Sequence, residues 1–284
     1  MKNILVTGGS GFVGSHLVNL LVKKKYKVTV IDIKRPKIEK VSYIKSNLSN
    51  FEKLKKITKK FDCVYHLAGV SDITKVKSIP IETIKNNILF SSYLIEACRI
   101  NKVKRFIFAS SIYAHGKAGN LYTSSKVATE QIIKNFNLLF NLKYTILRYS
   151  TIYGSHNRGV DVITLFTRKA RNNKKIKVHG NGLQTRDFVH AEDIARASLY
   201  AMNSKYKNKT LTVGHNKKTR IIDLAKKIIK LTNSKSKINK DKANKRQDDF
   251  DLSKMPKINK RDFLKYKFKY TLDNGIKNLL SITR

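Results

Sequence analysis

Residues 8–14 read GGSGFVG, and this turn decides the fold prediction. It follows an apolar run at 2–7, typical of a buried parallel strand, and opens a segment at 11–24 with apolar residues at helical spacing. Glycines at positions 8, 11 and 14 allow a tight strand-to-helix turn and a close approach of ligand to backbone. The start of a helix carries unpaired N–H groups and partial positive charge. We therefore predict a dinucleotide-binding turn, with its diphosphate on the helix end.

An acidic residue follows this turn at the distance expected for a cofactor contact. Asp32 comes after a second predicted strand at 27–31, eighteen residues beyond Gly14. Its carboxylate can accept hydrogen bonds from both hydroxyls of an adenosine ribose, and its charge repels a 2′-phosphate. Lys34 and Arg35 follow closely and could tolerate such a phosphate, which keeps NADP as the second choice. The pattern favours NAD as the cofactor.

Strands and helices alternate through the first half of the chain. Further strands are expected at 62–67, 105–109 and 144–148, and helices at 81–100 and 122–140. Such alternation predicts an α/β fold, a doubly wound parallel sheet of the Rossmann type.

The alternation loosens after residue 154. We expect helices at 160–172, 191–203 and 221–231, a short strand at 210–213, and a lysine-rich loop at 235–246. We therefore divide the chain into a dinucleotide-binding Rossmann domain at 1–154, to which 188–214 return, and a smaller C-terminal substrate-binding lobe, which makes up most of 155–284.

The composition is strongly basic. Lysines and arginines number 60 against 19 acidic residues, which gives the 284-residue chain a net charge of +41. Nucleic acid or an anionic membrane would fit such a charge. However, 47 of the 60 are lysines spread along the whole chain, whereas phosphate and base readout tends to use arginine. We interpret the charge as compositional bias that still attracts an anionic diphosphate, and we expect no specific nucleic-acid partner.

The remaining composition indicates a cytoplasmic protein. No segment has the roughly 20 apolar residues of a membrane span, and no secretory pattern opens the chain, so we expect no membrane association. Cys63 and Cys98 lack a metal-type spacing and lie in apolar stretches. We expect two buried thiols in a reducing compartment, and no metal site.

Tyr122 and Lys126 lie four residues apart at the start of a predicted helix, so they share one face. A free tyrosine has a pKa of about 10 and is a poor base, but a nearby ammonium favours the phenolate and lowers that pKa. Such a tyrosine can remove a hydroxyl proton while a hydride leaves the same carbon. Ser111, after the strand at 105–109, could orient the hydroxyl. We predict Ser111, Tyr122 and Lys126 as the catalytic residues.

Seven stretches make the chain resemble the extended short-chain dehydrogenase/reductase family, in its nucleotide-sugar epimerase/dehydratase branch. They read TGGSGFVGS (7–15), HLAG (66–69), FIFASS (106–111), YTSSK (122–126), LRYSTIYG (147–154), GNGLQTRDFVHAEDIARA (180–197) and YKFKYTLDNGI (266–276). They keep the family's order and cover nearly the whole chain, and QTRDFVH is specific to nucleotide-sugar enzymes. The resemblance implies NAD-dependent epimerisation of a nucleoside-diphosphate sugar, at C4, through a transient 4-keto intermediate. It also implies a homodimer formed through two helices per subunit.

The resemblance implies roles for individual residues. Those expected at the cofactor are Gly8, Gly11, Phe12, Val13, Gly14, Asp32, Asn47, Leu48, Leu67, Ala68, Gly69, Asn87, Tyr122 and Lys126. Those expected at the substrate are Ser111, Thr151, Arg186 and Arg246. The two arginines would contact the diphosphate, because guanidinium forks suit phosphate oxygens. His66 and His190 fall within matched motifs and are interpreted as structural.

Some positions depart from the family pattern. Tyr122 follows Ser111 by only eleven positions, whereas relatives with this lobe have a longer segment that touches the sugar, so the identity of the sugar stays open. Ile112 and Tyr113 stand where dehydratases have Asp and Glu. These missing acids argue against a dehydratase or a decarboxylase, because dehydration needs an extra acid and base. Asn47, Thr151 and His115 replace an Asp, an Asn and a Tyr.

Two alternatives to an epimerase stay open. A nucleotide-sugar reductase or dehydrogenase would use the same triad but would consume its cofactor stoichiometrically. A non-catalytic NAD-binding regulatory protein would bind NAD without turning over any nucleotide sugar; the complete triad weighs against it.

Overall fold

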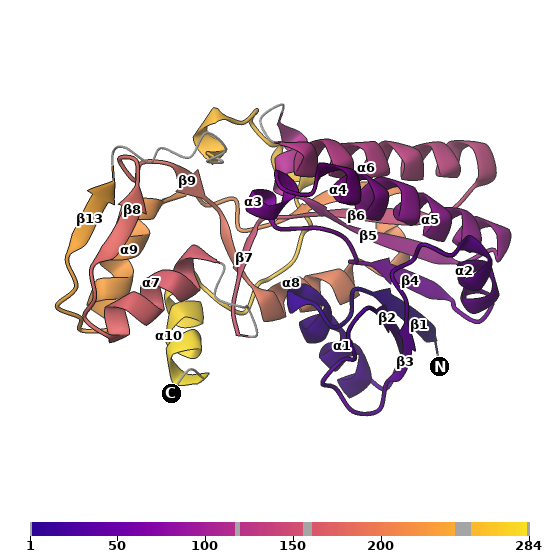
Figure 1. Cartoon of the computed structure of the whole chain (residues 1–284), viewed down its shortest axis with the longest axis horizontal. Coiled ribbons are helices and arrows are strands. Elements are labelled where there is room, and N and C mark those ends of the chain that lie inside the picture. The colour runs from indigo at the N-terminus through magenta and orange to yellow at the C-terminus, as the bar shows by residue number, and fades with distance from the viewer. Residues whose placement is uncertain (1, 117–119, 156–160, 242–250, 283–284) are drawn as a thin grey trace.

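A seven-stranded parallel sheet forms the centre of the protein (Figure 1). The computed structural model describes residues 2–116, 120–155, 161–241 and 251–282. In chain order the strands of the sheet are β1 (Asn3–Thr7), β2 (Lys27–Asp32), β3 (Ser42–Lys45), β4 (Cys63–His66), β5 (Arg105–Ser111), β6 (Tyr144–Tyr149) and β11 (Lys209–Val213). In space their order is β11-β6-β5-β4-β1-β2-β3, so the chain winds outward from β1 in one direction and from β4 in the other. The predicted doubly wound fold is confirmed.

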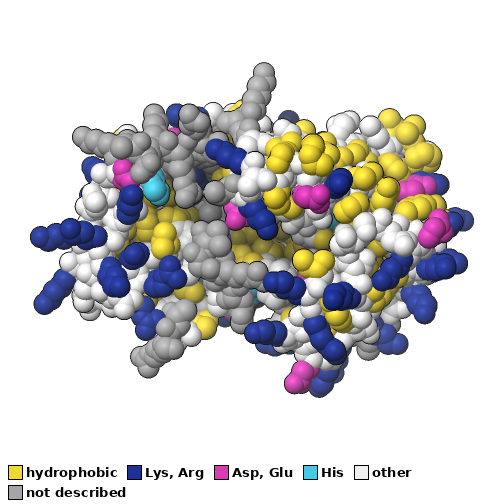
Figure 2. Space-filling view, viewed as in Figure 1, with side chains coloured by type: hydrophobic (Ala, Val, Ile, Leu, Met, Phe, Trp, Pro, Cys, Tyr) yellow, Lys and Arg dark blue, Asp and Glu magenta, His cyan; other side chains and the backbone are white. Residues whose placement is uncertain are grey.

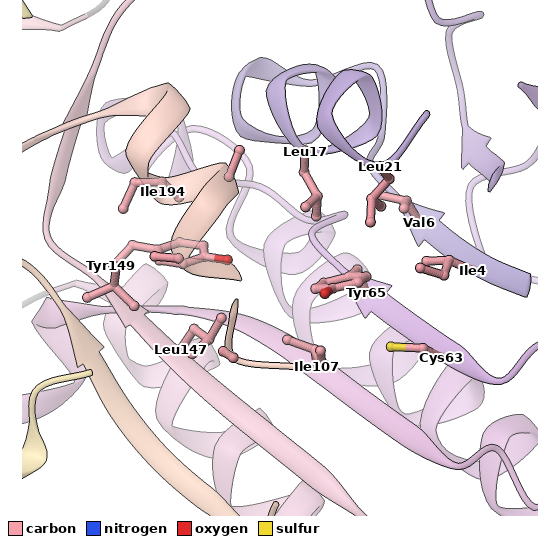
Figure 3. Packing of buried hydrophobic residues seen from close by; sticks show 14 of the residues in the cluster. Ile4, Val6, Leu17, Leu21, Cys63, Tyr65, Ile107, Leu147, Tyr149 and Ile194 are labelled. Atoms are coloured by element: carbon pink, nitrogen blue, oxygen red, sulfur yellow. The ribbon is translucent and has the colours of Figure 1, made fainter. Parts of the chain in front are cut away.

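Helices cover both faces of this sheet. On one face lie α1 (Phe12–Lys23) and α8 (Ala191–Tyr200); on the other lie α2 (Phe51–Thr58), α5 (Phe90–Ile100) and α6 (Leu121–Phe140). Figure 3 shows the first of these interfaces, where Leu17 and Leu21 of α1 meet strand residues such as Ile4 and Tyr65. Burial on both faces explains why the strands read as continuous apolar runs.

The predicted helix at 81–100 is interrupted. It consists of α4 (Pro80–Ile84), a π-helical turn η1 (Lys85–Leu89) and α5. Short helices flank the same region: α3 (Ile73–Val76) and the 3-10 turn η2 (Ile112–His115). A π-helical turn often marks a functional site, and this one carries the buried side chain of Asn87.

A second, smaller core lies in the C-terminal part of the chain, at the left of Figure 1. Its elements are α7 (Val162–Arg171), β8 (Ile176–His179), α9 (Ile221–Leu231), β13 (Ile238–Asp241) and α10 (Leu272–Ile282). Two short strand pairs join this lobe to the rest: β7 (Thr151–Tyr153) with β10 (Phe188–His190), and β9 (Thr185–Arg186) with β12 (Thr219–Arg220). The remaining 3-10 turns are η3 (Ser204–Tyr206), η4 (Leu252–Lys254) and η5 (Lys260–Asp262).

The loop predicted at 235–246 is wrong for 238–241. These residues form β13, which pairs in parallel with β8. Ile238 packs against the core of the lobe, and Lys177 forms an ion pair of 2.6 Å with Asp241. Backbone pairing to a buried neighbour thus outweighs the polar composition of the segment. Within the ranges that the structure describes, no helix is long and apolar enough to cross a bilayer.

Candidate active site

The glycine turn between β1 and α1 leaves no room for a side chain at Gly8 or at Gly14. Gly8 has a φ of +73°, and a Cβ there would lie 2.6 Å from the backbone nitrogen of Ala68. A Cβ on Gly14 would lie 2.1 Å from the carbonyl oxygen of Gly8. Gly11 precedes α1 and provides no side-chain cap, so the first N–H groups of the helix are left to a ligand. This cradle, in which positions 8 and 14 accept only glycine, suits the diphosphate of a dinucleotide.

Asp32, the last residue of β2, is hydrogen-bonded to the same turn. Its two carboxylate oxygens accept hydrogen bonds from the backbone N–H groups of Ser10 and Lys34, each at 3.0 Å. The ribose-binding residue predicted from the sequence therefore stands beside the phosphate turn. Asn47 is exposed and its Oδ1 is engaged by Ser49, with the Ser49 hydroxyl at 2.7 Å.

The other residues expected at the cofactor differ in how deeply their side chains are buried. Phe12 and Val13 open α1 and are half-buried, whereas the Leu48 side chain is only 3% exposed and packs into the core. Leu67, Ala68 and Gly69 form the loop that follows β4.

Asn87 fixes the loop after β4. Its Oδ1 accepts the N–H of Val70 at 2.7 Å, and its Nδ2 donates to the Val70 carbonyl at 3.0 Å and to Ser125 Oγ at 2.9 Å. A Cβ on Gly69 would lie 2.7 Å from the same Oδ1. The Asn87 amide, expected beside the cofactor, therefore ties the loop after β4 to α6.

Ser111, Tyr122 and Lys126 meet at the carboxyl end of the sheet. Ser111 is the last residue of β5, and the other two lie on the first turns of α6. Asn120 caps this helix: its Oδ1 accepts the N–H of Tyr122 at 2.9 Å. The Lys126 ammonium donates to the carbonyl oxygen of Ala109 at 3.0 Å. The predicted triad is thus assembled at the same end of the parallel sheet as the glycine turn.

The expected lowering of the tyrosine pKa is wrong for the protein alone. Burial raises the pKa of Tyr122, and the hydrogen bond with Ser111 offsets this only in part. Burial also lowers the pKa of Lys126 to about 8, against which the Glu130 carboxylate acts. Desolvation of this site therefore favours the neutral forms of both groups. Further positive charge beside the phenol would be needed to make it a base.

Two histidines within the family motifs make structural contacts. His66 is fully buried, with Thr7 Oγ1 at 2.7 Å from Nδ1 and Ser91 Oγ at 2.8 Å from Nε2. Burial lowers its pKa to about 3, helped by the charge of Lys126. His190 caps α8 and packs against Tyr270 at 4.1 Å between ring centroids. Both were interpreted as structural from the sequence, and their contacts agree.

Two of the residues expected at the substrate lie in the short strands that join the C-terminal lobe to the rest of the chain. Arg186 is in β9, and Thr151 is in β7, where its N–H donates to the Asp187 carbonyl at 2.9 Å. Arg246 lies outside the described residues. Asp251 accepts the N–H and the hydroxyl of Thr185, both at 3.0 Å, which anchors the C-terminal segment next to Arg186.

Sequence reasoning missed a charged group beside the triad. Glu130 is 2% exposed and forms a bidentate ion pair with Arg148 of β6. The available signal was its position, because residue 130 lies one helical turn beyond Lys126 on the same face. Tyr113 stands where dehydratases have a glutamate. Its ring packs edge-on against that of Tyr122, at an interplanar angle of 83° and with 6.3 Å between ring centroids.

Comparison with known proteins assigns the family. Residues 4–214 match the model of the NAD-dependent epimerase/dehydratase family. A protein of Methanocaldococcus jannaschii assigned as a UDP-glucose 4-epimerase is 32% identical over 78% of this chain and 79% of its own. The UDP-glucose 4-epimerase of Thermotoga maritima, solved with UDP-glucose, superposes with a TM-score of 0.88 at 27% identity, covering 99% and 98% of the two chains. The UDP-N-acetylglucosamine 4-epimerase of Methanobrevibacter ruminantium gives 0.85 at 29% identity, covering 99% of each. The chain therefore belongs to the NAD-dependent epimerase/dehydratase family and is an enzyme that uses NAD.

Proposed function

We propose that the protein epimerises a nucleoside-diphosphate sugar at C4 through a transient 4-keto intermediate. The observation that carries this proposal is the juxtaposition of Ser111, Tyr122 and Lys126 with the glycine turn, at one end of the sheet. Support for the substrate class comes from the relatives, whose solved structures include one with UDP-glucose and one with UDP-glucuronic acid and NAD. Ile112 and Tyr113 supply no carboxylate, which disfavours dehydration of the keto sugar.

Each residue of the site has a distinct task in this reaction. Bound NAD would supply the hydride acceptor for C4 of the sugar and the hydride donor for its opposite face. Ser111 orients the C4 hydroxyl, and Tyr122 takes its proton and later gives it back. Lys126 supplies positive charge that stabilises the phenolate form of Tyr122. No net oxidation results, so one bound cofactor serves successive turnovers.

The remaining predicted residues hold the two ligands. The Gly8–Gly14 turn would bind the cofactor diphosphate, and Asp32 would accept its adenosine ribose hydroxyls. Arg186 would bind the diphosphate of the substrate as a guanidinium fork, with Thr151 beside it. Arg246 is proposed for the same diphosphate on sequence grounds alone.

A panel of nucleotide sugars tests the proposal. Each would be incubated with the purified protein, and the products would be separated by chromatography. We expect interconversion of a C4 epimer pair, with loss of turnover but normal NAD binding in Tyr122→Phe. Tyr200→Phe, on the exposed surface of α8, serves as the matched control. Full activity of Tyr122→Phe would refute the mechanism, and stoichiometric consumption of NADH would identify a reductase instead.

We also propose that the protein is a homodimer. Large apolar side chains are exposed on neighbouring helices, and Figure 2 shows hydrophobic surface gathered where Figure 1 places α4, α5 and α6. The exposed residues of this helical face are Ile81, Ile84, Leu89, Val127, Leu138, Leu139 and Phe140. Such a patch is typical of a protein interface. Light scattering should give twice the monomer mass, and Val127→Lys with Leu138→Lys should halve it; a monomeric wild type would refute the proposal.

We place the enzyme in the cytoplasm. Cys63 and Cys98 are buried free thiols, as expected of a protein kept in a reducing compartment. Cell fractionation of the native source would test this, and recovery outside the cytoplasmic fraction would refute it.

A further inference from the structure

A buried ion pair joins the catalytic helix to the two strands beside it. Glu130 Oε1 accepts from Arg148 Nε at 2.9 Å, and its Oε2 accepts from Arg148 Nη2 at 2.6 Å. The hydroxyl of Ser110, next to the catalytic Ser111, donates to the same Oε1 at 2.6 Å. Removing two charges from water costs several kcal/mol each, and an apolar pair of similar volume often serves stability as well. Stability alone is therefore a weak reason for this pair.

His115 completes the network from the turn that follows Ser111. Its Nδ1 accepts from Arg148 Nη1 at 3.0 Å, which leaves Nε2 to donate to Thr212 Oγ1 at 2.7 Å. Burial and the Arg148 charge lower the pKa of His115 to about 4, so the imidazole is neutral at physiological pH. The histidine therefore satisfies Arg148 without adding a second cation. The Glu130 carboxylate is thus held by β5 and β6, with η2 and β11 behind it.

Lys126 lies one turn before Glu130, in a site that disfavours its charge. Its side chain is 7% exposed, and its ammonium lies 4.8 Å above the centre of the Phe108 ring of β5. The groups around the ammonium are neutral: His66 of β4, Asn87 of η1 and, on α6 itself, the Tyr122 phenol. From β6, Arg148 is a cation that is already paired. The Glu130 carboxylate attracts the Lys126 ammonium and so opposes the lowering of the Lys126 pKa by burial.

We propose that Glu130 is a positioning residue for the catalytic pair: clamped by Ser110 and Arg148, its carboxylate keeps the buried Lys126 ammonium charged beside Tyr122. The proposal rests on the proposed function, in which this charge stabilises the phenolate. A carboxylate one helical turn away favours the ammonium form by direct attraction. Because the clamp holds the carboxylate to three donors, its position relative to Lys126 does not depend on side-chain rotation in solvent.

The variant Glu130→Gln tests this directly. The amide keeps the size of the side chain and an acceptor oxygen but removes the charge. The first readout needs no turnover: a 13Cε NMR titration of the lysines, in which the signal missing from Lys126→Arg identifies Lys126. We expect the midpoint of Lys126 to fall by roughly one pH unit in Glu130→Gln. With substrate, the alkaline limb of kcat/KM should move down with it, and kcat should fall while KM stays within about threefold.

Two controls separate an electrostatic role from a structural one. Glu96→Gln breaks a similar bidentate ion pair, with Arg99 on α5, and should leave the Lys126 midpoint unchanged. If Glu130→Gln folds poorly because Arg148 is left unpaired, the double variant Glu130→Gln/Arg148→Gln removes both charges and should still lower the midpoint.

The outcomes are distinct. A folded variant, single or double, with the wild-type midpoint overturns the proposal, whatever its melting temperature. A lowered midpoint in a protein that epimerises no nucleotide sugar refutes the proposed function and leaves the link between Glu130 and Lys126 standing.

Discussion

The two glycines that flank the start of α1 should respond very differently to alanine. In Gly14→Ala the new Cβ would lie 2.1 Å from the Gly8 carbonyl oxygen and 2.8 Å from the Gly9 Cα. Both neighbours are backbone atoms, so the turn must open by about 0.9 Å to bring the 2.1 Å distance even to 3.0 Å, the lower limit for a Cβ contact. Overpacking of this kind costs about 1–3 kcal/mol. Opening also strains the 2.9 Å hydrogen bond from the Gly8 N–H to Ile31, worth about 1 kcal/mol.

Alanine has a better helix propensity than glycine, which offsets about 1 kcal/mol of these two costs. We therefore expect Gly14→Ala to lower the free energy of unfolding by roughly 2 kcal/mol. Gly11→Ala is the matched control. Its Cβ would be 3.2 Å from the same oxygen, which a shift of a few tenths of an ångström relieves, and its φ of −75° suits alanine. Its stability should stay within roughly 0.5 kcal/mol of wild type, because the weaker cap and the stiffer unfolded chain offset each other.

Urea unfolding and NADH fluorescence titration measure the two effects separately. Gly14→Ala should lose both stability and NAD affinity, whereas Gly11→Ala should lose affinity only, because its methyl group stands at the surface that the diphosphate approaches. Equal stability of the two variants would show that the close contact seen at Gly14 does not govern the turn.

Two further predictions concern charged groups. Burial lowers the pKa of Lys126 from 10.5 to about 8, so the unfolded chain binds this proton more tightly and wild-type stability rises as the pH climbs from 8 toward 10.5. Lys126→Met should therefore be about 1–3 kcal/mol more stable than wild type at pH 7, with a gain that vanishes near pH 10.5 in denaturant titrations; a gain independent of pH would contradict this. For Asp251, burial raises the pKa, but hydrogen bonds from Thr185 and Ser253 outweigh it and lower the pKa from 3.8 to about 2. Asp251→Asn should be less stable than wild type above pH 3.8, and the difference should close as the pH falls toward 2; a constant difference across acid unfolding curves would exclude the carboxylate as its source.

The sequence predicts the elements whose pattern is local. Strands β1, β4 and β5 lie between helices on both faces, so each leaves a continuous apolar run that can be read directly. The pairs β7–β10 and β9–β12 have two or three residues per strand, too few for any period to show. Strand β13 is hidden for another reason: it lies in the polar, lysine-rich segment 235–246, which resembles a loop, and only its pairing with β8 makes it a strand.

The candidate site divides in the same way. Motifs with a fixed spacing contain Gly8, Asp32, Tyr122 and Lys126, so these residues can be predicted from the sequence. The clamp on Glu130 comes from β5 and β6, and no spacing along the chain reveals which strands will lie beside α6. The shift in the pKa of Tyr122 was likewise misjudged, because it depends on how deeply α6 buries the phenol.

The π-helical turn η1 also has a bearing on how this protein can change by insertion and deletion. A π-helical turn holds one residue more than an α-helical path of the same length. Deleting one residue from 85–89 would therefore let α4 and α5 join as one regular helix without turning either about the axis, whereas the same deletion within α5 would rotate one side by about 100°. The change would fall on the turn itself, which places the Asn87 amide against Val70 and Ser125, and would leave Ile81 and Ile84 on the helical face. A single codon lost here would thus disturb the loop that Asn87 holds and little else, whereas a codon lost from α5 would turn one part of the helix against the other.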